Sequence, residues 1–177
     1  KIKNVGDFAF SENGLMRLDV IPQLENVGDS AFAYCASIEF GEIGESFKAL
    51  GVACFDNCEG ITGVTIPSCV EIVPQACFNG VDLTSIVIEN GVKQIKASAF
   101  RSNDSASIVI PQSVEYIGEY AFYSTKLRNV RIESQAAEIA QNAFYVSRRL
   151  TLQVYENSTA QDFAVQYSVK YEIIEEE

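Results

Sequence analysis

The chain has 177 residues, of which 47% are hydrophobic and 21% are charged, as expected for a folded globular protein. Its net charge of −11 disfavours binding to nucleic acid or direct contact with an anionic membrane, because like charges repel. No apolar run approaches the ~20 residues of a membrane span, and the first residues, KIKNVGDFAF, lack the apolar stretch of a signal peptide.

One six-residue pattern, an aliphatic residue followed five positions later by phenylalanine, occurs seven times. The copies are VGDFAF (5–10), VGDSAF (27–32), LGVACF (50–55), VPQACF (73–78), IKASAF (95–100), IGEYAF (117–122) and IAQNAF (139–144). The phenylalanines are 22 or 23 residues apart, and a small residue, Ala or Cys, precedes each of them. A fixed period of this length predicts a repeat architecture.

A second block of ten residues follows each motif, and its fourth and sixth positions are apolar almost throughout. The blocks are LMRLDVIPQL (15–24), IEFGEIGESF (38–47), ITGVTIPSCV (61–70), LTSIVIENGV (83–92), SASIVIPQSV (105–114), LRNVRIESQA (127–136) and RLTLQVYENS (149–158). A spacing of two is the strand period, and the β-branched content agrees with it. Each unit is therefore predicted to form one short strand and a return segment. A single unit cannot bury its own apolar residues, so the units must stack on one another.

These units predict a repeat solenoid in which seven repeats of 22–23 residues occupy 1–158, the first truncated at its N-terminal side. Successive strands form a parallel sheet, with turns and short 3-10 segments on the outer face. Val5, Phe10 and Val20 and their equivalents form the continuous core. Gly41 replaces a strand aliphatic of the second unit, so we expect this rung to pack less well.

Glycine occupies the second motif position in four copies, as Gly6, Gly28, Gly51 and Gly118. Pro74 takes the same position in another copy, and proline holds φ at about −65°. We therefore predict that this glycine serves a turn or close packing rather than a positive φ.

The last strand block runs into Ser158-Thr159-Ala160-Gln161, an S-x-x-Q capping box. The apolar spacing over 160–167 predicts an amphipathic helix of two to three turns, and alternation over 169–173 predicts a final strand. Residues 159–177 are therefore expected to form a C-terminal cap and an acidic tail. At the other end, Ile2 matches the last position of a strand block whose strand is absent, so we expect further sequence upstream of Lys1.

The two blocks together resemble the BspA-like, treponemal-type leucine-rich repeat. ITGVTIPSCV (61–70), and SASIVIPQSV followed by EYIGEYAF (105–122), carry the resemblance most closely, and it extends over 1–158. It implies a right-handed leucine-rich-repeat coil with the sheet on its concave face. It also implies a secreted or surface-attached protein of host-associated bacteria or certain protozoan parasites, some of which are adhesins. The family motif contains no catalytic residue, so the resemblance transfers none.

The chain has five cysteines, no C-x-x-C pair and no histidine. The lack of histidine removes the Ser-His-Asp and Cys-His catalytic arrangements and the commonest metal ligand. Cys54 and Cys77 share one repeat position, and Cys35 and Cys58 share another, so each pair is predicted to stack in neighbouring coils. A bridge or a two-thiolate metal site is one reading, and small buried hydrophobic residues are the favoured one. Cys69, in an outer loop, is predicted to be the exposed thiol.

The odd positions of each strand block are predicted to point away from the core, onto the concave face. The candidate partner-binding residues there are Arg17, Asp19, Phe40, Glu42, Thr65, Val87, Glu89, Val109, Asn129, Arg131, Glu133, Gln153 and Tyr155. The middle of this face is small and apolar, with charge towards both ends, which fits a binding strip for a partner protein or an ordinary solvated sheet. Asp19 and Glu42 occupy adjacent rungs and are interpreted as surface charges, because a flat sheet lacks a glycosidase cleft and the ligand number of a calcium site.

The sequence therefore predicts a non-enzymatic extracellular or cell-surface module for protein binding or adhesion, with no cofactor and no metal. The expected partner is a host or bacterial surface or extracellular protein, with neither nucleic acid nor membrane insertion involved. Two alternatives remain. One is a structural spacer within a longer surface protein, and the other is an accessory region of a secreted hydrolase whose catalytic part lies elsewhere.

Overall fold

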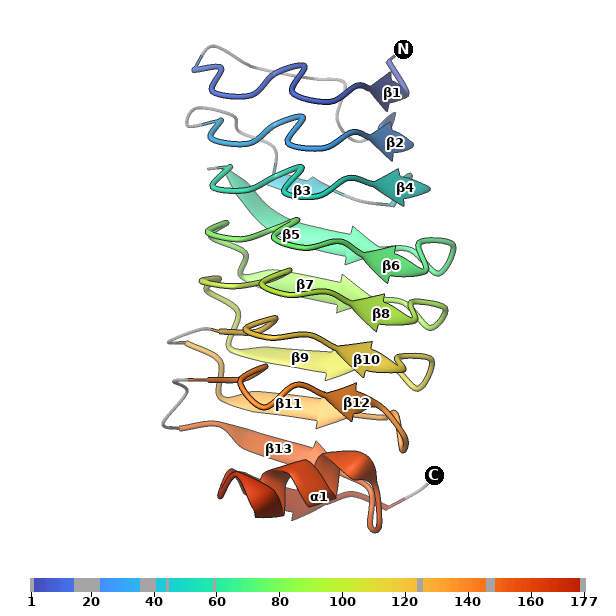
Figure 1. Cartoon of the computed structure of the whole chain (residues 1–177), viewed down its shortest axis with the longest axis vertical. Coiled ribbons are helices and arrows are strands. Elements are labelled where there is room, and N and C mark those ends of the chain that lie inside the picture. Colours follow the sequence, from blue (N-terminus) through green and yellow to red (C-terminus); the bar gives the residue numbers. More distant parts are fainter. Residues whose placement is uncertain are drawn as a thin grey trace.

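Two ladders of parallel strands run along the molecule and enclose a common core (Figure 1). The computed structural model describes residues 2–14, 23–35, 41–43, 45–58, 60–123, 126–145 and 149–175, with the backbone alone for 41–43. This arrangement confirms the predicted solenoid with a parallel sheet. The first predicted strand, with Val20, lies outside the described residues.

The longer strands form the predicted sheet, which we call the long-strand sheet. Its members are β3 (Gly41–Ile43), β5 (Ile61–Ile66), β7 (Ser85–Ile88), β9 (Ser107–Ile110), β11 (Asn129–Ile132), β13 (Thr151–Val154) and β14 (Lys170–Ile173). Equivalent repeat positions face each other across neighbouring strands, so that Val109 pairs with Arg131 and Arg131 with Gln153. The fixed register makes each repeat position a straight column of side chains along the sheet.

A second ladder of two-residue strands was not predicted. It consists of β1 (Asn4–Val5), β2 (Asn26–Val27), β4 (Ala49–Leu50), β6 (Ile72–Val73), β8 (Gln94–Ile95), β10 (Tyr116–Ile117) and β12 (Glu138–Ile139). Each of these strands ends at the aliphatic residue of the motif, and neighbours pair in parallel except β4 and β6, which form no pairing although both are fully described. Two residues are too few to show a period, so the pattern identified these aliphatics as core but not as strand.

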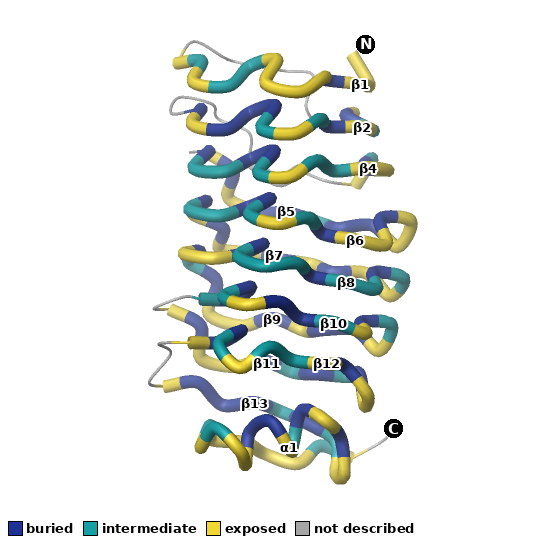
Figure 2. The backbone as a smooth tube through the Cα atoms, viewed as in Figure 1, coloured by how far each residue is buried: buried dark blue, intermediate teal, exposed yellow. Residues whose placement is uncertain are grey.

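The motif phenylalanines stack on one another between the two ladders. Centroids of neighbouring rings lie 5.3 to 5.6 Å apart from Phe10 to Phe144, with interplanar angles of 2° to 15°. Phe32, Phe55, Phe78 and Phe100 are fully buried. Buried residues accordingly alternate with exposed ones along the coils in Figure 2. The predicted continuous core is confirmed for the described repeats.

The return segments are turns whose backbone alternates in handedness. The residue two before each motif phenylalanine has a φ of 49° to 56° in six coils: Phe8, Ser30, Ala53, Ala76, Ser98 and Tyr120. This conformation points alternate N–H groups at the next coil, where the Ala53 N–H donates to the Gln75 carbonyl and the Phe55 N–H to the Cys77 carbonyl, both at 2.9 Å. No glycine marks these positions, so the sequence carried no signal for them.

The motif glycines have no positive φ, as predicted, and Gly28, Gly51 and Gly118 serve close packing instead. A Cβ atom on Gly51 would lie 2.4 Å from the Asp29 nitrogen of the preceding coil, and one on Gly118 would lie 2.7 Å from the Ala97 nitrogen. Both distances are below contact, so glycine permits the close approach of the two coils.

The C-terminal cap forms as the sequence predicts. Helix α1 (Thr159–Gln166) begins after Ser158, whose Oγ accepts from the Gln161 N–H at 3.2 Å. The Gln161 side chain reaches back to the Asn157 N–H at 2.7 Å, one residue before the position that a capping box uses. Phe163 of α1 meets Phe144 edge to face, with centroids 6.1 Å apart, and so ends the stack of rings.

The rung that contains Gly41 is irregular. Gly41 pairs with Ile61, but Glu42 pairs with Gly63, so the register of β3 against β5 shifts by one residue. This bulge fits the expectation of weaker packing where glycine replaces an aliphatic residue.

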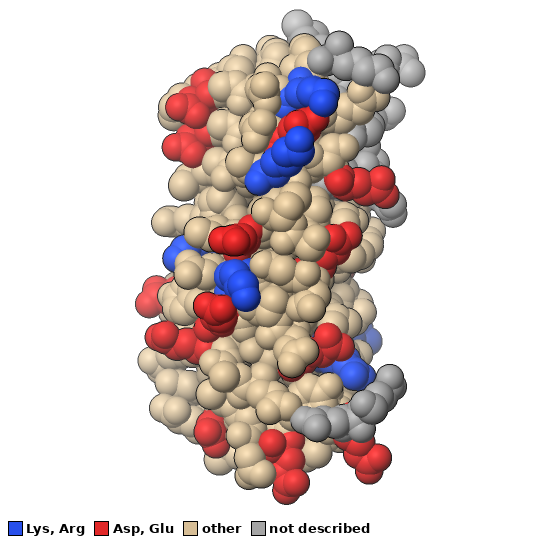
Figure 3. Space-filling view, turned by 90° about the vertical axis from the view of Figure 1, so that its right-hand side faces the viewer, with Lys and Arg blue, Asp and Glu red and all other residues tan. Residues whose placement is uncertain are grey.

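An ion-pair network links three coils on the short-strand side. Glu25 accepts hydrogen bonds from Lys3 of the preceding coil and from Lys48 of the following coil, the latter at 2.7 Å. The two ammonium groups lower the pKa of the Glu25 carboxyl from 4.5 to about 2. Elsewhere, acidic and basic side chains are interspersed on the face drawn in Figure 3, and its basic groups form no broad patch.

Replacing Phe78 with alanine should lower the free energy of unfolding by about 3–5 kcal/mol, because it removes one ring from a close-packed column. Urea denaturation measures this change. Phe8→Ala is the matched control, since Phe8 is 66% exposed and alanine occupies the same backbone conformation at Ala53. The control should change stability by less than about 0.5 kcal/mol, and equal losses in both variants would contradict the assigned core.

The Glu25 carboxyl should titrate with a pKa of about 2, measurable by NMR. A folded-state pKa below the unfolded value means that the pair stabilises the fold above pH 4.5 and loses this effect as the pH falls towards 2. Lys48→Ala should move the Glu25 pKa back towards 4.5, while Lys126→Ala, which removes a distant cation, should leave it unchanged. A Glu25 pKa near 4.5 in the unaltered chain would refute the network.

Candidate functional site

The outward face of the long-strand sheet carries the predicted columns of side chains. Strands β7 and β9 alternate between exposed and buried residues, with Val87 48% exposed and Val109 46% exposed. Asn129 is exposed at the start of β11, and Arg131 and Gln153 are half-buried further along their strands. Two neighbouring valines thus form an apolar centre beside polar side chains from the next two coils.

A pocket of about 430 Å³ lies on this face, and we call it the sheet pocket. It is lined by Thr84, Ser85, Ile86, Val87, Ile88, Ser107, Ile108, Val109, Asn129, Arg131 and Gln153. Five of the predicted candidate residues therefore meet in one hollow: Val87, Val109, Asn129, Arg131 and Gln153. The volume is within the range of about 300–1,000 Å³ that is common for binding sites.

The sheet pocket lies where the long-strand sheet is discontinuous. β7 pairs with β5 and β9 pairs with β11, but no pairing joins β7 to β9, although both strands are fully described. Pro111 removes one hydrogen bond at this junction. In the equivalent positions the N–H groups of Glu89 and Glu133 donate to the Ile66 and Ile110 carbonyls of the preceding strand, at 3.0 and 2.9 Å. Proline has no N–H, so the corresponding bond from β9 to β7 is absent.

Arg131 is the one charged residue that lines the sheet pocket. Its Nε donates to the Glu133 carboxylate at 3.2 Å, and both side chains are 34% exposed. This bond uses one of the five guanidinium N–H groups. The pocket therefore combines an apolar centre, neutral hydroxyl and amide groups, and a single positively charged donor.

The other candidate residues whose side chains are described do not line the sheet pocket. Thr65 is half-buried beside Val87 on β5, and the Glu89 carboxylate accepts from the Ser68 N–H at 2.9 Å. The Tyr155 carbonyl accepts from the Ser158 hydroxyl at the start of the cap. Four candidates cannot be placed as side chains, because they lie outside the described residues or are described by backbone alone: Arg17, Asp19, Phe40 and Glu42.

Six lining residues were not among the candidates: the polar Thr84, Ser85 and Ser107, and the buried Ile86, Ile88 and Ile108. Ser85 and Ser107 occupy the same odd positions as the candidates, so their outward direction was predictable from the strand period. Thr84 lies just before β7, and its hydroxyl donates to the Thr62 carbonyl at 3.0 Å. No periodic signal marks it.

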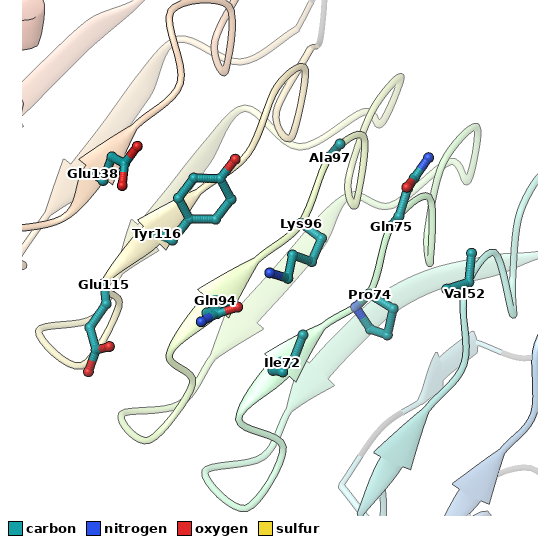
Figure 4. Close-up of a pocket in the computed structure, with 10 residues that line it drawn as sticks. All are labelled: Val52, Ile72, Pro74, Gln75, Gln94, Lys96, Ala97, Glu115, Tyr116 and Glu138. Atoms are coloured by element: carbon teal, nitrogen blue, oxygen red, sulfur yellow. The ribbon is translucent and has the colours of Figure 1, made fainter.

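A further hollow, of about 770 Å³, lies over the short-strand ladder (Figure 4). Ile72, Gln94, Tyr116 and Glu138 line it from successive strands β6, β8, β10 and β12. The Lys96 ammonium lies 5.4 Å from the centre of the Tyr116 ring, so the basic group there is already engaged. This hollow follows from the stacking of the coils along the ladder.

The cysteines stack as predicted, and all five are free thiols. The sulfur atoms of Cys54 and Cys77 are 3.1 Å apart in the core, and burial raises the pKa of Cys77 well above its ordinary value. Burial likewise raises the pKa of Cys35, whose thiol donates to the Phe10 carbonyl at 3.0 Å. Cys69 is exposed, which confirms its prediction. The described residues contain no group of three or more His, Cys, Asp or Glu arranged to hold a metal ion.

A family model supports the repeat assignment made from the sequence. The model described as "BspA type Leucine rich repeat region" matches in six copies, over residues 1–105, 25–151 and 93–167. No curated protein matches the chain. The described part of the chain contains no helix with the length and hydrophobicity of a membrane span.

Several solved structures resemble this one. A leucine-rich cell surface protein from Faecalibacterium prausnitzii is 25% identical, with a TM-score of 0.68 over 76% of this chain and 37% of that chain. A leucine-rich repeat protein from Bacteroides ovatus is also 25% identical, with a TM-score of 0.72 over 98% of this chain and 46% of that chain. The pneumococcal vaccine antigen PcpA, at 13% identity and a TM-score of 0.56, shares the fold over 100% of this chain and 60% of its own. This chain thus spans less than half the length of the first two.

A water-soluble maleimide should label one cysteine, Cys69, in the native chain and all five after unfolding. Raising the pH to about 9 should not open the other four thiols to reaction, because the reagent cannot reach side chains that are fully buried. Mass spectrometry counts the labels, and Cys69→Ser should reduce the native count to zero. Rapid labelling of a second cysteine in the folded chain would show that the core thiols are accessible.

Proposed function

Because the chain belongs to the family of BspA-type leucine-rich repeat regions, we propose that it is an extracellular or cell-surface module that binds a partner protein through the sheet pocket. The F. prausnitzii neighbour is described as a cell surface protein, which supports the location. The fold neighbours and the family are repeat proteins, and this agrees with a binding role rather than a catalytic one.

The observation that carries the proposal is the meeting of Val87, Val109 and Arg131 in one hollow. Two half-exposed valines favour an apolar side chain of the partner, since burying it removes apolar surface from water. The Arg131 guanidinium favours a carboxylate or carbonyl next to that side chain. The expected partner surface therefore presents an apolar residue beside a hydrogen-bond acceptor.

The sheet pocket also lies at an interruption of the strand ladder, where Pro111 removes a backbone bond. A structural spacer requires only continuous stacking, and it has no use for such an interruption. An accessory region of a hydrolase would need a binding face, just as an adhesion module does. Which of these two functions the chain serves therefore depends on the rest of the protein.

Substituting Val87 with aspartate should abolish partner binding, because it buries an unpaired charge in the apolar centre. The measurement is biolayer interferometry of the folded chain against a panel of purified host matrix and epithelial surface proteins. Val52→Asp is the matched control, since Val52 is 47% exposed but lies over the other ladder. We expect at least about a tenfold loss for Val87→Asp and for Arg131→Glu, and no loss for the control.

A panel protein that binds the native chain and both sheet variants equally would refute the sheet pocket as the site. If the native chain binds no panel protein at micromolar concentration, the spacer function is favoured instead. Circular dichroism of each variant establishes that the solenoid remains folded, which the exposure of both valines leads us to expect.

A further inference from the structure

A third hollow, which we call the cap pocket, lies at the C-terminal end of the solenoid, away from the sheet pocket. Its volume is about 760 Å³, within the range of about 300–1,000 Å³ of small-molecule sites. Residues 120 and 141–145 of the last return segments form one wall, and residues 163 and 167–170 of the cap form the other. It therefore lies where the regular stacking of coils ends and α1 begins (Figure 1).

The floor of the cap pocket is apolar and its rim is aromatic. Phe144, Leu150 and Phe163 line it and are only 5% to 6% exposed. Tyr145, at 61% exposure, presents its ring at the rim, held against Tyr120 at 6.5 Å between centroids. These rings offer flat apolar faces whose hydroxyl groups remain close to water.

The polar groups of the cap pocket are almost all neutral. Gln141, Asn142, Ser168 and the tyrosine hydroxyls each donate and accept hydrogen bonds. Among the described lining residues Lys170 alone is charged, and its ammonium lies 3.5 Å from the Glu172 carboxylate, so its charge is already partly compensated. None of these described residues brings a carboxylate side chain to the pocket.

The Asn142 amide has capacity that the protein does not use. Its Oδ1 atom is buried and has no hydrogen-bond partner among the described residues. A buried acceptor without a partner costs free energy, so such groups in folded proteins usually await a water or a ligand. The backbone carbonyl of Asn142, by contrast, accepts hydrogen bonds from the backbone N–H groups of Tyr120 and Tyr145, both at 3.2 Å. These bonds place Asn142 between the two tyrosines.

The aromatic rim is not a requirement of the repeat. The column directly after the motif phenylalanine contains small or polar residues in the first five coils and tyrosine only in the last two: Ser11, Ala33, Asp56, Asn79, Arg101, Tyr123 and Tyr145. Stacking of the coils therefore does not explain the gathering of tyrosines at this end.

We infer that the cap pocket binds a neutral saccharide. A sugar ring presents a C–H face that packs on an aromatic ring, and hydroxyl groups that both donate and accept. A purely apolar ligand would leave the Gln141 and Asn142 amides without partners. Among the described lining residues, an anion would find the one cation paired and a cation would find no carboxylate. This site is separate from the sheet pocket and does not depend on the protein-binding function.

The test is saturation-transfer difference NMR of the full chain with four neutral trisaccharides: maltotriose, cellotriose, xylotriose and chitotriose. Isothermal titration calorimetry then gives the dissociation constant for any that binds. We expect at least one to bind at about 1 mM or tighter, and Tyr145→Ala to weaken it at least about tenfold. Gln141→Ala, an exposed position that does not contribute to the core, should weaken it as well.

Tyr34→Ala is the matched control, because Tyr34 is an exposed tyrosine, at 56%, in an early coil. Loss of binding in Tyr145→Ala and Gln141→Ala together with retention in Tyr34→Ala supports the site. The inference fails if none of the trisaccharides binds up to about 10 mM, or if binding survives both cap-pocket variants unchanged. Val87→Asp should bind the saccharide normally, which separates this result from the outcome for the sheet pocket.

Discussion

The stack of phenylalanine rings is the interaction on which the rest of the molecule depends. Neighbouring centroids lie 5.3 to 5.6 Å apart, close to the spacing of about 4.8 Å between hydrogen-bonded strands. One ring per coil therefore matches one strand per coil in both ladders, and the register of the paired strands follows, apart from the shift between β3 and β5. A repeat with an extra residue between its phenylalanine and its strand must accommodate that residue in a loop, as the two 23-residue repeats do.

This register converts repeat positions into columns, so function arises from how a column varies along the molecule. On the long-strand sheet, one column changes from Val87 and Val109 to Arg131 and Gln153. In the return segments, the column directly after the motif phenylalanine changes from small or polar residues to tyrosine in the last two coils. Neither change affects the core, which explains how one fold presents an apolar and cationic pocket on one face and a neutral aromatic pocket at one end.

Both pockets lie where the regular repeat is interrupted. The sheet pocket coincides with the missing pairing of β7 and β9, to which Pro111 contributes by lacking an N–H. The cap pocket lies where Phe163 ends the ring stack edge to face instead of continuing it. Each of these two pockets therefore coincides with a departure from the repeat, whereas the hollow over the short strands follows from the stacking of the coils.

The sequence by itself determined the repeat, the phase of the long strands, the buried ring column and the capped helix after Ser158. It did so because the alternation of apolar residues and the 22-residue period determine which face of the sheet each side chain occupies, whatever the neighbouring residues are. Tertiary structure decided the two-residue strands, the positive φ of residues such as Ala53, and the pockets. Two-residue strands show no period, and the φ values depend on hydrogen bonds to the next coil. The pockets depend on contacts between residues about one repeat or more apart, such as Tyr120 and Tyr145, which no local pattern encodes.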